Sequence, residues 1–381
     1  MKKILIYLLC VILFGCYNNQ KTELVSTTEN QDKPFDNVEC YEVGMKWNGH
    51  LKYTSGPFYE LNVIEKTTDL KSLLVRKDTI TILKINSLKL KELPEELLLF
   101  TNLEALDISD NPFQNLEKLI SDLSKFPRLQ LLAMNHCGIV ELPDNLSRLN
   151  NLIGLALNQN EGLKNISKVH QLDKLKYLDI SGNKKLKDLP DDIGSLKCLE
   201  QIVMGGSGII RLRDELTYCI NLREITANAC KIKELPINIG NLKKLKKLNL
   251  GANRIELIPE SIGELSELDY LSLGTNDIFY LPESISNLRE LYSISLELNR
   301  FRAFPREVLK LRNLRYLDLH NNNFKDVPIE VADLPNLTRV YVDHELISDD
   351  NIEVLRNRNP DLEVESRDAL RLVPNEPKRK N

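Results

Sequence analysis

The sequence predicts an α/β solenoid, in which short parallel strands form a curved sheet and short helical or irregular returns cover its outer side. An aliphatic residue opens each of twelve consecutive units, and nine of the eleven intervals between these residues are 23 long. The opening residues are Ile80, Leu103, Leu129, Leu152, Leu175, Leu199, Leu222, Leu245, Leu268, Leu291, Leu314 and Leu337. Such a unit buries its apolar face only against neighbouring units, so the period predicts a stacked array.

The order of residues within a unit predicts its elements. Residues 245–267 read LKKLNLGANRIELIPESIGELSE. In the first part, Leu248 and Leu250 alternate with Lys247 and Asn249, which predicts a strand with the leucines facing inward. Pro259 then interrupts regular structure, so the rest of the unit predicts a short helical or irregular return. Twelve strands would stack in parallel on the concave side.

A recurrent asparagine marks the turn after each strand. Its amide can bond backbone groups that the turn leaves unpaired inside the core. The slot is filled by Asn111, Asn160, Asn183, Asn253, Asn276, Asn299 and Asn322, and by the small substitutes Cys137, Ser207 and Cys230. We therefore expect an asparagine ladder along the array.

These units resemble leucine-rich repeats with an LPxxIxxL ending, as in plant intracellular Ras-group-related proteins and many bacterial repeat proteins. The resemblance covers about 80–347 and implies a horseshoe-shaped leucine-rich-repeat solenoid. It also implies a platform that binds a protein or peptide with its concave face, although a fold alone does not identify a ligand.

The amino terminus predicts export. Lys2 and Lys3 precede an apolar run at 4–14, which is shorter than the about 20 apolar residues of a membrane-spanning helix. We interpret residues 1–15 as a signal peptide. The run ends in Leu-Phe-Gly-Cys, which resembles a bacterial lipobox and implies that Cys16 becomes the lipidated amino terminus, although Phe14 departs from the usual residue. An ordinary signal peptide and an uncleaved anchor are the alternatives.

The remaining segments complete the predicted organisation. Residues 16–36 are polar and predict a flexible tether, so the expected product is a membrane-attached lipoprotein of the bacterial cell envelope. Residues 37–79 predict an amino-terminal cap with Trp47 as its aromatic plug, and a small recognition module is the rival interpretation. Residues 348–366 predict a helix and a strand that cap the array, and 367–381 a loose tail.

Composition and motifs argue against several classes of function. The 51 basic and 55 acidic side chains give a net charge of −4, which disfavours nucleic acid as a partner. No phosphate-binding glycine loop, GxSxG elbow, HExxH helix or kinase signature occurs, so we expect no enzyme and no cofactor.

Cys198 and Cys219 lie in neighbouring returns, where a disulfide is possible but free thiols are favoured. We expect a monomer.

Outward strand positions near the carboxyl end predict the ligand site. They gather tyrosines, which make favourable contact residues, and acidic side chains, which favour a basic partner. The predicted site residues are Tyr270, Tyr292, Glu297, Tyr316, Asp318, His320, Tyr341 and Asp343. The alternatives are that these tyrosines only cover neighbouring strands, that the protein is a glycan- or cell-wall-binding module, or that it is a structural spacer.

The same cluster contains a possible metal or acid–base site. His320 and Asp343 occupy equivalent offsets in adjacent strands, with Asp318 and His344 nearby, and imidazole and carboxylate groups suit zinc. An ordinary ion pair is the favoured interpretation, so no metal is expected.

The central units have small residues at the outward positions, which predicts a low groove floor there. These small residues are Gly154, Ala156, Gly205, Gly206, Gly251, Ala252 and Gly274.

Overall fold

The structure, a computed structural model, describes residues 65–66, 70–343 and 349–367. They belong to one compact unit, Val63–Asn381. The predicted signal peptide, Cys16, the tether, Trp47, His344 and residues 368–381 lie outside the described residues.

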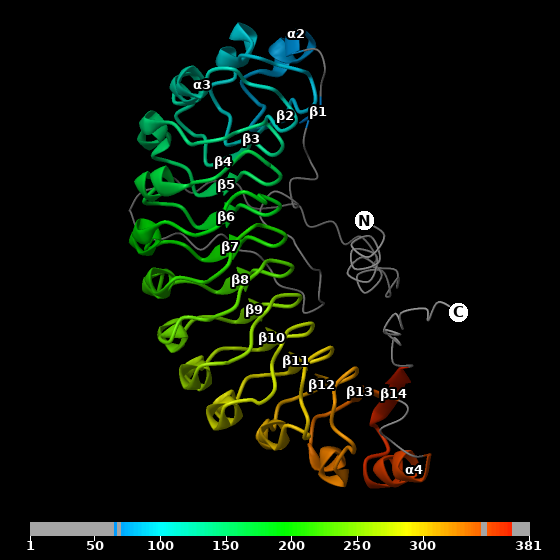
Figure 1. Cartoon of the computed structure of the whole chain (residues 1–381). Coiled ribbons are helices and arrows are strands. Elements are labelled where there is room, and N and C mark those ends of the chain that lie inside the picture. Colours follow the sequence, from blue (N-terminus) through cyan, green and yellow to red (C-terminus); the bar gives the residue numbers. More distant parts are fainter. Residues whose placement is uncertain (1–64, 67–69, 344–348, 368–381) are drawn as a thin grey trace, which may run out of the picture. The chain divides into compact units, whose positions relative to one another are not determined.

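A single parallel sheet of 14 strands runs through the described array in sequence order (Figure 1). Its strands are β1 (Glu65–Lys66), β2 (Ile82–Lys84), β3 (Ala105–Asp107), β4 (Leu131–Ala133), β5 (Gly154–Ala156), β6 (Tyr177–Asp179), β7 (Gln201–Val203), β8 (Glu224–Thr226), β9 (Lys247–Asn249), β10 (Tyr270–Ser272), β11 (Ser293–Ser295), β12 (Tyr316–Asp318), β13 (Arg339–Asp343) and β14 (Glu363–Arg367). The twelve predicted units supply β2–β13, and the flanking segments add β1 and β14.

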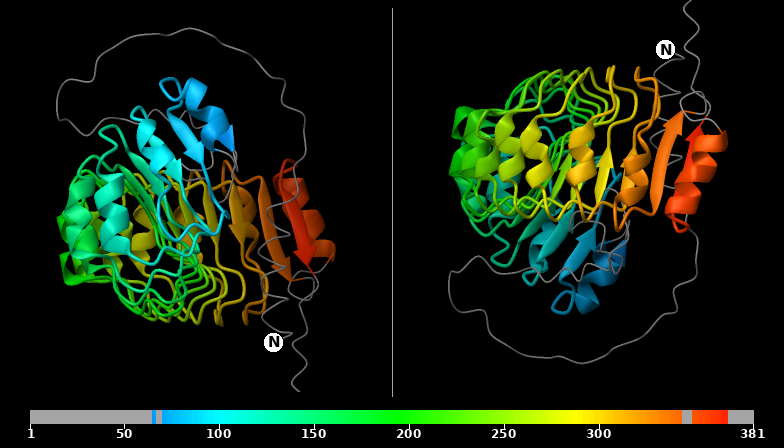
Figure 2. Two further views of the ribbon diagram at one scale, coloured as in Figure 1. Left: turned by 90° about the horizontal axis from the view of Figure 1, so that it is seen from above. Right: turned by 90° about the horizontal axis from the view of Figure 1, so that it is seen from below.

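The returns are mostly single turns of 3-10 helix. They are η1 (Leu74–Arg76), η2 (Glu95–Leu99), η3 (Asp144–Leu149), η4 (Ser167–Gln171), η5 (Asp191–Ser195), η6 (Asp214–Tyr218), η7 (Ile239–Asn241), η8 (Glu260–Glu264), η9 (Glu283–Asn287), η10 (Arg306–Lys310) and η11 (Ile329–Asp333), and the α-helices are α2 (Leu70–Leu73), α3 (Leu116–Leu123) and α4 (Asp349–Arg358). The predicted proline break is present, since Pro259 lies directly before η8 in an extended conformation. Figure 2 views the array from both ends and shows the helices and strands on opposite sides.

The strand phase predicted from alternation is confirmed. Leu248 and Leu250 are fully buried, whereas Lys247 and Asn249 are only half-buried on the opposite face. Adjacent strands pair in register, so Lys247 lies opposite Tyr270, which in turn lies opposite Ser293. Each inward side chain therefore packs on its equivalent in the neighbouring units, and each outward side chain lies in a row along the face.

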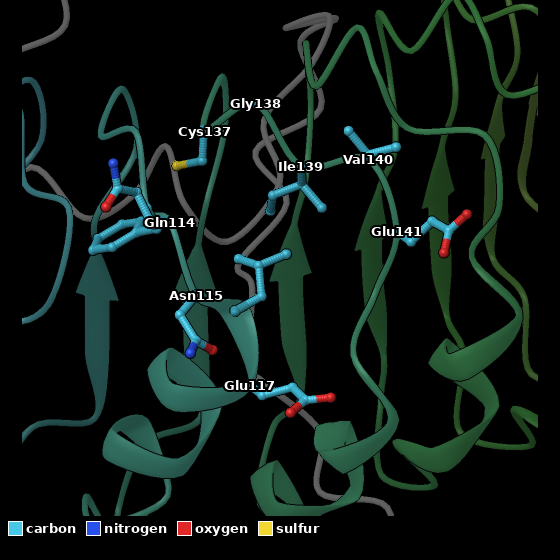
Figure 3. Close-up of a pocket in the computed structure, with 10 residues that line it drawn as sticks. Gln114, Asn115, Glu117, Cys137, Gly138, Ile139, Val140 and Glu141 are labelled. Carbon is cyan, nitrogen blue, oxygen red and sulfur yellow. The ribbon is translucent and has the colours of Figure 1, made fainter.

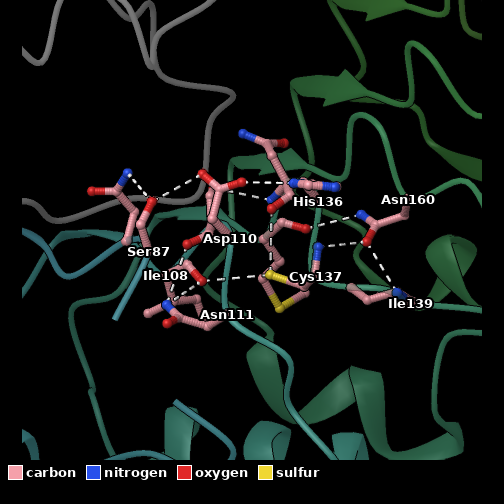
Figure 4. A network of polar contacts seen from close by, with 12 residues as sticks. Ser87, Ile108, Asp110, Asn111, His136, Cys137, Ile139 and Asn160 are labelled. Atoms are coloured by element: carbon pink, nitrogen blue, oxygen red, sulfur yellow. Dashed lines mark hydrogen bonds and ion pairs between the residues drawn. The ribbon is translucent and has the colours of Figure 1, made fainter. Parts of the chain in front are cut away.

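The asparagine ladder is also confirmed (Figure 4). The Asn160 side-chain NH2 donates to the carbonyls of Met134 and Leu157, each at 2.9 Å. Its oxygen accepts from the backbone N–H groups of Cys137 (2.9 Å) and Ile139 (3.0 Å) in the preceding unit. One buried amide thus satisfies four backbone groups across two units, so the ladder connects the turns of the array.

A cysteine in the asparagine position can replace the donor bonds of the amide but not its acceptor bonds. The Cys137 thiol donates to the Ile108 carbonyl at 3.5 Å, but it has no amide oxygen to accept the N–H groups. Burial raises the pKa of Cys137 to about 11 and that of Cys219 to about 12, so both remain protonated thiols at neutral pH. No disulfide joins Cys198 and Cys219, as favoured from the sequence.

Helix α4 and strand β14 close the carboxyl end of the described array. α4 occupies the segment where the sequence predicts a helix, and β14 extends the sheet beyond the last repeat. Arg358 of α4 donates to both carboxylate oxygens of Asp333 in η11, at 2.5 and 2.7 Å. None of the described helices has the length and apolar character to cross a bilayer.

Candidate binding surface

Strand pairing brings four of the predicted site residues together on one face of the sheet. Pairing places Tyr270 and Tyr316 in one row with Arg339, and Asp318 and Tyr341 in the next row. We call this surface the carboxy-terminal patch; it comprises Tyr270, Tyr292, Glu297, Tyr316, Asp318, His320, Arg339, Tyr341 and Asp343.

The tyrosines of the patch differ in exposure. The Tyr316 side chain is exposed, at 36%, and Tyr292 and Tyr341 are half-buried. Tyr270 is only 6% exposed, so it offers little surface to a ligand in this structure. Tyr316 therefore offers the largest open aromatic surface among them.

Arg339 lies next to Tyr316 in the outward row, and it is not among the predicted site residues. Its guanidinium lies 5.9 Å from the centre of the Tyr316 ring. It also bonds the Glu363 carboxylate of β14 at 2.6 Å and approaches Glu365 at 3.2 Å. These contacts fix the arginine beside the aromatic ring, and the pair forms an ordered amphipathic surface.

The histidine pairs with a different aspartate from the one in the adjacent strand. His320 Nδ1 contacts the Asp318 carboxylate two residues earlier. Both oxygens of Asp343 instead accept the Asn321 backbone N–H, each at 2.8 Å. His320 and Asp343 thus follow paired residues of adjacent strands, as expected from their offsets, but the ion pair of His320 is made with Asp318, and the backbone of the turn satisfies Asp343.

Glu297 occupies space that its neighbour leaves free. A Cβ atom at Gly274 would lie 1.9 Å from the Glu297 carboxylate oxygen, so the carboxylate rests over the glycine. The Ser295 hydroxyl donates to it. Burial, and secondarily the charge of Asp318, raises the pKa of Glu297 above its usual value. The predicted low floor at Gly274 is therefore filled by a carboxylate from the next unit, which corrects that expectation.

The same filling occurs at Gly205 in a central unit. A Cβ atom at Gly205 would lie 2.6 Å from the Asn228 side-chain oxygen, so the amide of the next unit covers this glycine as well. At Gly205 and Gly274, glycine thus gives room to a polar side chain from the following repeat.

Two cavities of the array lie away from the patch. One, of about 410 Å³, lies between the start of α3 and residues 137–141 (Figure 3). The unit at 103–128 is three residues longer than its neighbours, which gives room for a true α-helix capped by Asn115. The other cavity, of about 330 Å³, involves Arg302 and Lys325. Within the described residues, no three His, Cys, Asp or Glu side chains are grouped to hold a metal ion.

Comparison with known proteins identifies the repeat. A family model described as leucine rich repeat matches residues 289–347, and another of the same description matches 174–196 and 244–265. The array is a leucine-rich-repeat solenoid. An internalin from Listeria monocytogenes has the same fold, with a TM-score of 0.62 and 22% identity over 76% of this chain and 88% of that one. The structure of a TLR13–ssRNA13 complex also has this fold. Its TM-score is 0.58, and its sequence is 22% identical over 71% of this chain and 44% of that one.

Curated relatives share only part of their length with this leucine-rich-repeat protein. A putative disease resistance protein of Arabidopsis thaliana is 27% identical over 49% of this chain and 14% of its own length. The adenylate cyclase of Schizosaccharomyces pombe is 27% identical over 46% of this chain and 10% of its own length. The chain therefore spans a small fraction of either relative.

Proposed function

We propose that this leucine-rich-repeat protein is a non-catalytic scaffold that binds a protein or peptide ligand through the carboxy-terminal patch. The observation that carries the proposal is the ordered contact between exposed Tyr316 and Arg339. Tyrosine and arginine are enriched among residues that dominate binding energy, and a side chain already held in place loses less entropy on binding.

Charge favours a basic polypeptide as the ligand. The patch and the adjoining strand contain five carboxylates and two arginines, because β14 adds Glu363, Glu365 and Arg367 to the residues of the patch. The structural neighbour TLR13 is named in complex with RNA, but an acidic surface on a chain with a net charge of −4 disfavours such a ligand here. We expect recognition to weaken as salt rises, because the attraction between charges at the rim is screened.

Binding should depend on Tyr316. Once a partner is isolated, we expect Tyr316→Ala to weaken its affinity by about 2 kcal/mol, because the open ring supplies buried contact area. Arg289→Ala, a change at an exposed residue between η9 and β11, should change affinity little. Titration calorimetry on both variants, after their melting temperatures are shown to be equal, measures the difference. A loss confined to Arg289→Ala would contradict this site.

We further propose that the scaffold is held at the bacterial cell envelope by a lipid on Cys16. The support is the short apolar run followed by Leu-Phe-Gly-Cys and the polar segment at 16–36. Two or three acyl chains would anchor the protein firmly, while the array remains in water.

Lipidation is tested by metabolic labelling. The wild type should incorporate a palmitate analogue and partition into detergent, whereas Cys16→Ser should lose the label and remain unprocessed, because the thiol is the acceptor. Cys10→Ser, within the predicted signal peptide, is the matched control and should be labelled normally. Cleavage of an unlabelled wild type at another position would contradict the anchor.

A further inference from the structure

An exposed aromatic pair lies on the side of the array between the strands and the helices. Phe279 and Tyr280 are 47% and 49% exposed, and Leu257 of the preceding unit is 52% exposed. The two aromatic rings pack edge to face with their centres 5.1 Å apart. These three apolar side chains take no part in the carboxy-terminal patch, and their exposure is unfavourable unless something covers them.

Equivalent residues of five successive units form a continuous surface around this pair. In each unit two exposed residues follow a buried one, and backbone bonds such as Arg300 N–H to the Ile278 carbonyl (2.8 Å) hold the neighbouring segments together. We call this surface the flank; it comprises Lys233–Glu234, Glu256–Leu257, Phe279–Tyr280, Arg302–Ala303 and Lys325–Asp326.

The two ends of the flank have the same order of charge. A lysine is followed by an acidic residue both at Lys233–Glu234 and at Lys325–Asp326, with the apolar residues between them. In the part of the chain that the structure describes, none of these four side chains has an ion-pair partner. The flank therefore presents the exposed apolar side chains of Leu257, Phe279 and Tyr280, with Glu256 and Arg302 beside them and an unpaired charge pair at each end.

This arrangement is complementary to itself. We propose that the flank is an interface between two copies of this chain, related by a two-fold axis parallel to the array. Each unit then faces the same unit of the other copy, so the first exposed residue of a pair meets the second. Phe279 meets Tyr280, Lys325 meets Asp326, and Lys233 meets Glu234.

The alternative direction of packing is disfavoured by the same charges. With the axis across the array, Arg302 would face Glu256 favourably, but Lys325 would face Lys233 and Asp326 would face Glu234, so like charges would oppose one another at both ends. Charge thus selects the orientation, and the exposed apolar side chains supply attraction.

The expected association is weak. Stable interfaces bury about 800 Å² on each partner and involve about 20–30 residues a side, whereas the flank supplies far fewer. We therefore expect a concentration-dependent dimer, which departs from the monomer expected from the sequence. Sedimentation of the full chain in density-matched detergent, from low to several hundred micromolar, should show it. A monomer throughout this range overturns the proposal.

Charge exchange gives the decisive experiment. Lys325→Asp and Asp326→Lys alone should each weaken self-association about tenfold, because each sets like charges opposite one another. An equal mixture of the two variants, carrying different affinity tags, should regain co-purification because the opposing charges are again complementary. Phe279→Ser should weaken association, whereas Ile237→Ser, an exposed change outside the flank, should not. Stronger self-association of Lys325→Asp, or no recovery in the mixture, overturns the parallel arrangement.

Discussion

Replacing Asn160 with alanine is expected to lower the free energy of unfolding by about 3 kcal/mol, because the change leaves several buried backbone groups without partners. The Asn160 amide accepts the N–H groups of Cys137 and Ile139 and donates to the Met134 and Leu157 carbonyls. Side-chain truncation by itself removes little apolar contact, so the loss would come from the unsatisfied polar groups. Urea titration followed by circular dichroism measures it.

Two further substitutions separate the hydrogen bonds from other effects. Asn160→Cys should cost less than Asn160→Ala, because Cys137 shows that a thiol in this slot can still donate to a carbonyl. Asn238→Ala is the matched surface control, since Asn238 is exposed and its side chain does not cap η7. Similar losses for Asn160→Ala and Asn238→Ala would show that the ladder does not stabilise the array.

The array was predictable because its contacts recur at a fixed separation in the sequence. A side chain such as Leu248 packs mainly on residues 23 positions away, so periodic spacing reveals both the strand phase and the neighbours. The asparagine slot is equally visible, since the turn requires the same polar partner in every unit. Periodicity did not predict β1, whose sequence lies outside the repeat.

The pairing of side chains on the inner face was less predictable. Offsets placed His320 and Asp343 together, but His320 bonds Asp318 and Asp343 bonds the Asn321 backbone. Side-chain rotamers and the geometry of the local turn decide these contacts, and the 23-residue spacing predicts neither of them. The role of Gly274 was missed for a similar reason, because the space above it belongs to the Glu297 carboxylate.

Arg339 illustrates a second limit. Its partners Glu363 and Glu365 lie on β14, after a segment that breaks the 23-residue pattern. A strand at 362–365 was expected from the sequence, but its register against β13 decides which side chains meet. The usable signal was the lone arginine among tyrosines in the outward row. The assignment of the patch as a ligand site stays a prediction, which the Tyr316 experiment tests.

Leu250→Ala is expected to destabilise the array by about 2–5 kcal/mol, which is the range for removing a buried leucine side chain and leaving a cavity. Leu250 is fully buried in the middle of the array, so both neighbouring units lose contacts. Because each repeat is stabilised largely by its neighbours, such a loss should lower the cooperativity of unfolding as well as the midpoint. Thermal and urea unfolding monitored together measure both quantities.

The outward lysine of the same unit provides the control. Lys247 is half-buried on the opposite face, and burial lowers the pKa of its ammonium, so truncation to alanine removes a group that is partly desolvated. Lys247→Ala should therefore change the free energy of unfolding by much less than Leu250→Ala. Equal losses from the two substitutions would mean that both faces of β9 are structural core, which would exclude this face as an open binding surface.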